Sequence, residues 1–361
     1  MNNCIVSIGD VALDIFSRIK SRKIKGELYY ATDTPAITSI HPGGSAANFA
    51  TWISRFEGKS AFIGRVGNDF IGDYLMKDLK DEGIILNVSK GSGYTAIIIA
   101  LIDESGERTM ITHRGESVNL SLEEIDLDLI SKANLIFIPA YSLFTGKISK
   151  TVLKLLSFVK ARSKIISKID LPNLKDDLPN LKKSNFSKEG SHRESLDNHK
   201  EYKNKNKSPL IAVDLSSYGG IKKYGPKKFE NLLKDIKPDI LFCNKDELMV
   251  LYPEVNFNKA IAESKNLSPI VMIKLGKEGC IVNYLDENAK ENVFRVKAEK
   301  VKVIDTTGAG DAFDAAFCYK YLKCGDVKKS AKFANSLASL VIAEYGARPK
   351  IDIKKNRYTI P

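Results

Sequence analysis

The most informative part of the sequence is Ile304-Asp305-Thr306-Thr307-Gly308-Ala309-Gly310-Asp311-Ala312-Phe313, near the C-terminal end of the chain. The β-branched residues Val301 and Val303 precede it, two closely spaced glycines lie inside it, and helix-forming residues follow. This order predicts a strand, a tight turn and the N-terminus of a helix. Backbone N–H groups at a helix N-terminus have no intrahelical partner and carry partial positive charge, so Gly308 to Gly310 are expected to bind an anion.

Asp311 is the unexpected residue of this stretch, because a carboxylate repels a bound anion unless it has a proton to accept. One interpretation is that it caps the helix, since aspartate is common at such positions. The other is that it receives a proton in a reaction at a bound phosphate. The residues from Gly308 to Asp311 alone are compatible with both.

The composition is that of one large α/β domain or two ordinary ones. Of the 361 residues, 43% are apolar and 28% are charged, and the net charge is +12. That charge suits an anionic ligand, but the lysines are spread along the chain without a nucleic-acid-binding motif, so we expect no nucleic-acid partner. The five cysteines and four histidines are scattered, which argues against a disulfide framework and a zinc site.

Neither the apolar runs nor the N-terminus suggest a membrane or secreted protein. The longest apolar run, residues 96–102, is far shorter than a bilayer span, and the first residues lack the pattern of a signal peptide. We therefore expect a cytoplasmic protein without a membrane partner.

Two N-terminal segments also end where ligands commonly bind. The apolar run Cys4 to Ile8 stops at Gly9, which predicts a buried strand followed by a loop that contains Asp14. Asp14 could hold a hydroxyl group there, or be a solvated turn residue. Gly43 and Gly44 precede small residues that lead to Asn48, which predicts a second turn into a helix N-terminus.

The stretch from Asp305 to Asp311 resembles, at every position, the C-terminal signature Asp-Thr-Thr-Gly-Ala-Gly-Asp of the ribokinase-like (pfkB) family of sugar and nucleoside kinases. The resemblance implies that Asp311 is the catalytic base for the substrate hydroxyl. It also implies that the amides of Gly308, Ala309 and Gly310 form an anion hole for the transferred phosphoryl group. Both roles suit phosphoryl transfer, which requires mainly positioning and charge stabilisation.

A second family motif, Gly-Gly-x-x-x-Asn, is similar to the segment with Gly43, Gly44 and Asn48, and Asp14 matches the aspartate of the family's first loop. The resemblance implies that these four residues bind the sugar. Arg114 follows a predicted hairpin, residues 94–101 and 108–112, and could contact a substrate hydroxyl or carboxylate; a solvated arginine is the alternative.

Further resemblances concern the nucleotide and its metal ions. Asn244 and Glu247 match an Asn-x-x-Glu motif that positions Mg²⁺ and phosphate through water, although the pair could instead cap a helix. Gly276 belongs to a Leu-Gly-x-x-Gly segment similar to a nucleotide-binding turn. Lys274, before it, is either a ligand of an ATP phosphate or a surface residue.

Near the C-terminus, Asn335 matches a position beside the adenine. The region of Asp305 and Thr307 matches a site for a monovalent cation, for which K⁺ is the candidate.

Together, the chain is identified as a ribokinase-like protein: a single domain over residues 1–361, with a doubly wound, mostly parallel α/β sheet flanked by helices and a small β-sheet lid. The lid is expected at roughly residues 15–40 and 94–114. Residues 169–208 are almost free of apolar side chains and are expected to be a disordered or surface insertion. Neither a P-loop nor a Gly-x-Gly-x-x-Gly motif is present.

The expected activity is ATP- and Mg²⁺-dependent phosphorylation of a sugar hydroxyl. A nucleoside kinase is the alternative, which Tyr29, Tyr30 and Tyr141 keep open because a nucleobase needs aromatic or apolar neighbours. A catalytically inactive binding protein is the third possibility. An exposed edge of the lid sheet would favour a homodimer formed through the lid.

Overall fold

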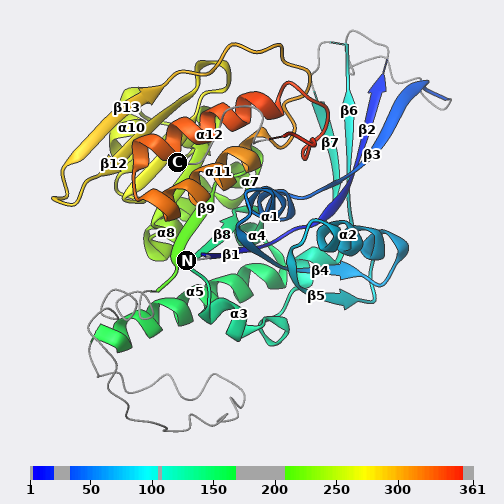
Figure 1. Cartoon of the computed structure of the whole chain (residues 1–361), viewed down its shortest axis with the longest axis horizontal. Helices are drawn as coiled ribbons and strands as arrows, with labels where there is room; N and C mark the ends of the chain where they lie inside the picture. The colour runs from blue at the N-terminus through cyan, green and yellow to red at the C-terminus, as the bar shows by residue number, and fades with distance from the viewer. Residues whose placement is uncertain (1–2, 20–32, 105–107, 168–207, 353–361) are drawn as a thin grey trace, which may run out of the picture.

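The computed structural model describes residues 3–19, 33–104, 108–167 and 208–352 (Figure 1). Its main body is a nine-stranded sheet in the order β13-β12-β11-β10-β9-β8-β1-β4-β5. The strands are β1 (Cys4–Ile8), β4 (Lys59–Gly67), β5 (Ile85–Gly91), β8 (Leu135–Pro139), β9 (Leu210–Asp214), β10 (Ile240–Asn244), β11 (Ile270–Lys274), β12 (Cys280–Leu285) and β13 (Glu291–Val296).

The sheet is parallel from β5 to β11, and only β12 and β13 are added in antiparallel fashion at one edge. Such a sheet needs helices on both faces, because its central strands are apolar on both sides. The α-helices are α1 (Ser45–Arg55), α2 (Phe70–Asp81), α3 (Leu127–Ser131), α4 (Tyr141–Phe144), α5 (Gly146–Ser167), α7 (Tyr218–Tyr224), α8 (Pro226–Ile236), α9 (Lys245–Leu251), α10 (Phe257–Ser264), α11 (Ala309–Cys324) and α12 (Val327–Val341).

Two cores follow from this layering. On one face, alternate residues of the central strands pack against α5, α8, α9 and α10, as Val213 packs near Phe229. On the other face, the intervening residues pack against α1, α11 and α12, as Phe137 stacks on Phe49 at 3.8 Å between ring centroids. The predicted doubly wound, mostly parallel architecture is therefore confirmed.

A second sheet of four strands, in the order β3-β2-β6-β7, projects from the body (Figure 1). Its strands are β2 (Ala12–Ile19), β3 (Ala36–Gly43), β6 (Ala96–Ile102) and β7 (Arg108–His113). They lie at or beside the two ranges expected for the lid. Tyr29 and Tyr30 lie outside the described residues, as do residues 168–207 of the expected insertion.

Three local predictions were wrong. Val301 and Val303 are not in a strand: the segment before Asp305 is irregular, and Val303 is 54% exposed, so no neighbouring strand pairs with it. Asp14 lies within strand β2 and not in a loop, because β2 begins only four residues after β1 and pairs with β3 and β6. The sequence of residues 122–132 also predicts a single helix, but the structure divides this segment into a short 3-10 helix, Leu122–Glu124, and α3.

Short 3-10 helices complete the connections, at Gly115–Asn119 after β7 and at Gly276–Glu278 after β11. Among the helices of the described part of the chain, none is both long and apolar enough to pass through a bilayer.

Candidate active site

Asp311 lies in the first turn of α11, where the predicted turn meets the body of the protein. Gly308 is the N-cap residue and has a left-handed backbone (φ 70°); a Cβ atom there would come within 2.6 Å of Ala347, so only glycine fits. No side chain caps this helix in the described part of the chain, and its first amide, that of Ala309, has only a long bond of 3.4 Å to Thr306 O. The predicted turn into a helix N-terminus is therefore present, and its role in binding an anion stays a prediction.

The carboxylate of Asp311 is half-buried and interacts with two residues at the start of α1. Asn48 Nδ2 donates to Asp311 Oδ2 at 2.7 Å, and Ser45 also forms a side-chain hydrogen bond with Asp311. Burial raises the pKa of Asp311 to about 6, although the bond from Asn48 opposes the shift. A carboxylate with this pKa can both accept a proton near neutral pH and be largely ionised beforehand.

The residues predicted to bind the sugar also lie close to Asp311: Asp14, Gly43 and Gly44. Strands β2 and β3 pair here, and the Asp14 carboxylate packs so closely on Gly43 that a Cβ atom at Gly43 would lie 2.0 Å from Asp14 Oδ2. Gly44 has φ 93° and precedes α1. Asp14 is buried, and burial raises its pKa to about 7, with Arg348 opposing the shift and Asp311 adding to it.

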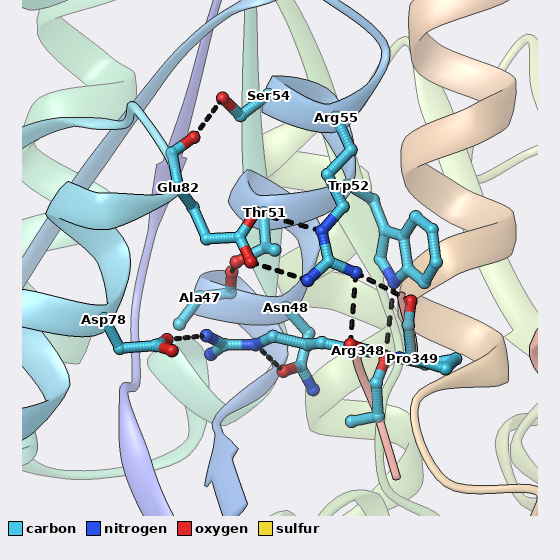
Figure 2. A network of polar contacts seen from close by, with 11 residues as sticks. Ala47, Asn48, Thr51, Trp52, Ser54, Arg55, Asp78, Glu82, Arg348 and Pro349 are labelled. Carbon is cyan, nitrogen blue, oxygen red and sulfur yellow. Dashed lines mark hydrogen bonds and ion pairs between the residues drawn. The ribbon is translucent and has the colours of Figure 1, made fainter. Parts of the chain in front are cut away.

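Arg348 was not anticipated from the sequence, yet it joins this group directly (Figure 2). Its Nε donates to Asn48 Oδ1 at 2.6 Å, its Nη1 to Asp78 Oδ2 at 2.7 Å and its Nη2 to Gly43 O at 3.1 Å. Its side chain is only 5% exposed. The sequence gives no motif that marks it, because its partners are some 270 to 305 positions away.

Lys274 is mostly buried, so it is not a surface residue, and its role as a ligand of an ATP phosphate stays a prediction. Its Nζ donates to Asp214 Oδ1 at 2.9 Å and to both oxygens of Asp314 at 3.1 and 3.2 Å. Burial alone would lower the pKa of Lys274, but these two carboxylates outweigh it and hold that pKa well above its usual value. The ammonium lies near the anion-binding turn, since a Cβ atom at Gly310 would be 3.4 Å from it.

Asn244 and Glu247 form the capping arrangement that was the alternative to a magnesium role. Asn244 Oδ1 accepts from the Glu247 amide, and Glu247 Oε2 accepts from the Asn244 amide, each at 2.8 Å. Burial and the negative charge of Asp214 raise the pKa of Glu247 to about 7. Capping thus explains the spacing of the pair, while the raised pKa means that a nearby cation would favour the ionised form of Glu247.

Asp305 and Thr307 stabilise the turn before α11. Asp305 Oδ1 accepts from the amide and hydroxyl of Thr307 at 2.9 and 2.6 Å, and its Oδ2 accepts from the Gly346 amide at 3.1 Å. Arg108, on lid strand β7, also donates to Asp305 Oδ1, at 2.5 Å. Burial raises the pKa of Asp305, but these hydrogen bonds outweigh it and hold the pKa below its usual value.

Gly276 and Asn335 lie on the expected nucleotide side. Gly276 has φ 55° and open space around it, in the turn after β11. Asn335 lies on α12 and borders a pocket of about 370 Å³; its Nδ2 also donates to Lys297 O at 2.7 Å. The pocket is lined by Arg295, Val296, Lys297, Glu299, Lys328, Lys332, Asn335 and Ser336.

Arg114 does not contact Asp14, Asn48 or Asp311 directly. It forms an ion pair with Asp10 and donates to Tyr141 O at 3.1 Å, while its guanidinium lies over the Tyr141 ring. Arg114 Nε and Asp10 Oδ1 are buried without a hydrogen-bond partner in the described part of the chain. A donor and an acceptor therefore remain available on this ion pair.

Sequence reasoning found the residues that lie within contiguous motifs and missed those that complete the site from distant elements. Ser45, Asp78, Asp214, Asp314 and Arg348 are the residues that it missed. Asp214 and Asp314 carried a weak signal, since Asp214 ends an apolar run and Asp314 lies within one.

Comparison with known proteins gives consistent results. The profile of the pfkB family carbohydrate kinases matches residues 3–185 and 222–354. "Probable fructokinase-6, chloroplastic" from Arabidopsis thaliana is 28% identical over 335 residues, covering 90% of this chain and 75% of that protein.

Two solved structures have the same fold. The adenosine kinase from Sinorhizobium meliloti superposes with a TM-score of 0.75 at 22% identity, covering 99% of this chain and 98% of that one. A candidate ribokinase II from E. coli, in complex with ATP and Mg²⁺, gives 0.71 at 20% identity, covering 96% and 94%. With the profile match over most of its length, and with this turn and these carboxylates in place, the chain belongs to the pfkB family of carbohydrate kinases and is a phosphotransferase that acts on an alcohol group.

Proposed function

We propose that the protein transfers the γ-phosphoryl group of ATP to a hydroxyl of a small sugar, with Asp311 as the general base. The amides of Gly308, Ala309 and Gly310 would stabilise the transferred phosphoryl group, and Asp14, Asn48 and the Gly43–Gly44 turn would hold the acceptor. The single observation that carries this proposal is Asp311 itself. A half-buried carboxylate with a pKa of about 6 lies in the first turn of a helix that no side chain caps in the described part of the chain.

The groups around Asp14 suit a polyhydroxylated acceptor. Asp14 is a buried carboxylate, which can accept hydrogen bonds from hydroxyl groups, and Asn48 offers an amide beside it. The available donor on Arg114 and acceptor on Asp10 would satisfy one further hydroxyl, which accepts one hydrogen bond and donates another. This supports Arg114 as a substrate-binding residue that acts through its ion pair with Asp10.

Glu247 and Asp214 are the residues that would hold Mg²⁺, through its water ligands. Their mutual repulsion, with burial, raises the pKa of Glu247, and a divalent cation with oxygen ligands fits such a pair. The metal would supply charge neutralisation on the phosphates of ATP. Lys274, near Gly310, adds a second positive charge on the nucleotide side, and Gly276 and Asn335 would border the nucleotide itself.

A nucleoside kinase is the second candidate, and one feature of the lid favours it. Paired residues of neighbouring strands share a face, so the register places Phe16, Ile98 and Met110 on the face of the lid that carries Asp14. Apolar side chains there would suit a nucleobase.

A screen for ADP release separates these candidates. The purified protein is incubated with Mg-ATP and with pentoses, hexoses, keto-deoxy acids and nucleosides, each against a no-acceptor control. We expect a sugar to give the largest kcat/KM. A preference for a nucleoside would support the second candidate, and no turnover with any of these acceptors would contradict both candidates.

We further propose that the protein forms a homodimer through the lid. The outer face of the lid, opposite Asp14, carries Ile40, Ile97, Ile99 and Ile111, of which Ile40 and Ile111 are 59% and 55% exposed. A hollow of about 350 Å³ lies on this face, lined mainly by Tyr94, Ile97, Ile99 and Ile111. Apolar surface of this kind on a sheet with exposed edge strands favours pairing with a second copy.

A further inference from the structure

All three guanidinium nitrogens of Arg348 donate hydrogen bonds within an interior network that leads to Asp311, the proposed base. Nε donates to Asn48, Nη1 to Asp78 and Nη2 to the carbonyl of Gly43. Asn48 in turn donates to Asp311. Figure 2 shows the arginine extended between α2, which carries Asp78, and α1, which carries Asn48.

The chemistry of arginine fixes the orientation of the Asn48 amide. A guanidinium can only donate hydrogen bonds, so the atom of Asn48 that faces it must be the carbonyl oxygen Oδ1. The amide nitrogen then has to point the other way, where Asp311 Oδ2 lies at 2.7 Å. Without the arginine, the amide could turn over, and its oxygen would face the carboxylate without a hydrogen bond.

Arg348 is itself held from the backbone side. Arg55 Nη1 donates to the carbonyls of Arg348 and Pro349 at 3.1 and 2.9 Å, and Trp52 Nε1 donates to Ala347 O at 3.4 Å. Arg55 is fixed by two bonds to Glu82, at 2.6 and 3.0 Å (Figure 2). The position of the guanidinium is therefore determined at both ends, which is what a residue that orients another one requires.

We propose that Arg348 is a positioning residue for the phosphoryl transfer: it locks the Asn48 amide so that Asn48 always donates to Asp311 and holds the base ionised and aligned. The inference rests on the proposed role of Asp311 as the base. It assigns no contact with substrate to Arg348, which acts through Asn48. It also gives Asp78 a function, since this carboxylate balances the buried positive charge.

Several other charged groups near Asp311 also affect its pKa, so they contribute to any pH profile of the reaction. Asp214 on β9 raises its pKa, Lys274 on β11 lowers it, and the Ser45 hydrogen bond lowers it. Asp14 on β2 and Asp314 on α11 are themselves affected by the charge of Asp311. Arg348 itself lowers the pKa of Asp14, so its replacement also changes the charge of that neighbour. A comparison of Arg348→Met with and without Asn48 separates this effect of charge from the loss of the Arg348–Asn48 contact.

The primary test is Arg348→Met, assayed for kcat, for KM of ATP and for the pH dependence of kcat/KM with the best acceptor sugar. We expect kcat to fall about tenfold and the acid limb to move upward by about half a unit to one unit, because the bond that favours ionised Asp311 is weakened. KM for ATP should stay unchanged. In the background of Asn48→Ala, Arg348→Met should have no further effect on the acid limb.

Two additional variants make the test decisive. Arg348→Met leaves Asp78 unpaired in a partly buried place; if that variant does not fold, the double variant Asp78→Asn/Arg348→Met, which removes both charges, replaces it. Arg65→Met is the matched control, because Arg65 also forms a partly buried ion pair, with Glu116 at 2.8 Å, that has no contact with Asn48 or Asp311. We expect it to lower the melting temperature without moving the acid limb.

An unmoved acid limb in a folded Arg348 variant would overturn the proposal, as would equal effects of Arg348→Met with and without Asn48. Failure of the proposed function looks different. If Asp311→Asn kept full turnover, the assignment of Asp311 as the base would be wrong, whatever the Arg348 variants did. If Asp311→Asn lost turnover while the Arg348 variants kept the wild-type acid limb, only the positioning role of Arg348 would be wrong.

Discussion

At the scale of single residues, the candidate site is a group of carboxylates that the fold keeps at unusually high pKa. Burial is the main cause for Asp14, Glu247 and Asp311. Arg348 and Lys274 bring positive charge to this group without neutralising all of it. A site of this kind favours the binding of a metal cation or of hydroxyl donors, and its buried acidic side chains make the folded state less stable than it would otherwise be.

The pKa of Asp311 predicts the pH dependence of the reaction. Below about pH 6 the carboxylate is protonated and cannot accept the proton of the substrate, so kcat/KM should fall tenfold per pH unit there and level off above. A profile from pH 4.5 to 9 with a saturating nucleotide measures this. A rate that stays constant down to pH 5 would exclude Asp311 as the titrating base.

Replacing Asp14 by asparagine should stabilise the protein, and the size of this effect should depend on pH. The pKa of Asp14 is about 7 in the folded protein and 3.8 in the unfolded chain. As the pH rises between these values, Asp14 ionises in the unfolded chain but stays protonated in the folded protein, so the free energy of unfolding falls. Asp14→Asn removes this cost and should stabilise the fold by about 1–3 kcal/mol at pH 8, but by little near pH 4. Urea unfolding at both pH values checks the sign; equal effects at both would contradict burial as the cause.

At the scale of elements, the lid contacts the turn before α11 directly. Arg108 of β7 donates to Asp305 and, at 3.2 Å, to Thr306, and Arg18 of β2 lies over the ring of Tyr345. These contacts bring a positive charge to the place where a monovalent cation is proposed. Because the oxygens of Asp305 already accept bonds from Thr307, Gly346 and Arg108, a cation would have to compete with Arg108.

We therefore propose that K⁺ binds near Asp305 and Thr307 when Arg108 leaves, and predict that Arg108→Met lowers the K⁺ concentration needed for half-maximal rate. The rate is measured with K⁺ exchanged for choline at constant ionic strength. Lys90→Met, which removes an exposed lysine that pairs with Asp73, is the control. No effect of K⁺ on either enzyme would contradict the site.

The elements also show what the sequence could and could not predict. The turn at Gly308, the turn from Gly44 into α1 and strand β1 were predictable, because each depends on neighbouring residues in the chain. The contact of Asn48 with Arg348 was not, because it joins residues 300 positions apart. The strand assigned to Val301 and Val303 failed since β-branched residues indicate a strand only where a partner strand is available.

At the scale of the whole molecule, the family profile is interrupted over residues 186–221, a range that overlaps the predicted insertion at 169–208. Helix α5 ends at Ser167 on one side, and β9 starts at Leu210 on the other. Both elements pack into the main core. The catalytic residues proposed here come from other parts of the chain.

Replacing residues 169–208 by a short Gly/Ser linker should therefore leave a folded and active enzyme. Thermal unfolding and kcat with the best sugar test this, and we expect both to stay near the wild-type values. A folded deletion variant with greatly reduced kcat would show that the segment contributes to catalysis.

The proposed dimer is tested by charge placed on the outer face of the lid. Ile40→Lys and Ile111→Lys together should convert a dimer to a monomer in analytical ultracentrifugation, because both side chains are more than half exposed and lie on the two edge strands of that face. Ile85→Lys, at an exposed residue of β5 outside the lid, is the control. A monomeric wild-type protein would contradict the proposal.

The most direct measurement is the turnover of Asp311→Asn with the best acceptor sugar, together with calorimetric binding of Mg-ATP to the same variant. Asparagine keeps the shape of the side chain but cannot accept the proton, so kcat should fall by about 10²- to 10⁴-fold while nucleotide affinity stays within a few-fold of wild type. Turnover close to that of the wild type would contradict the assignment of Asp311 as the base.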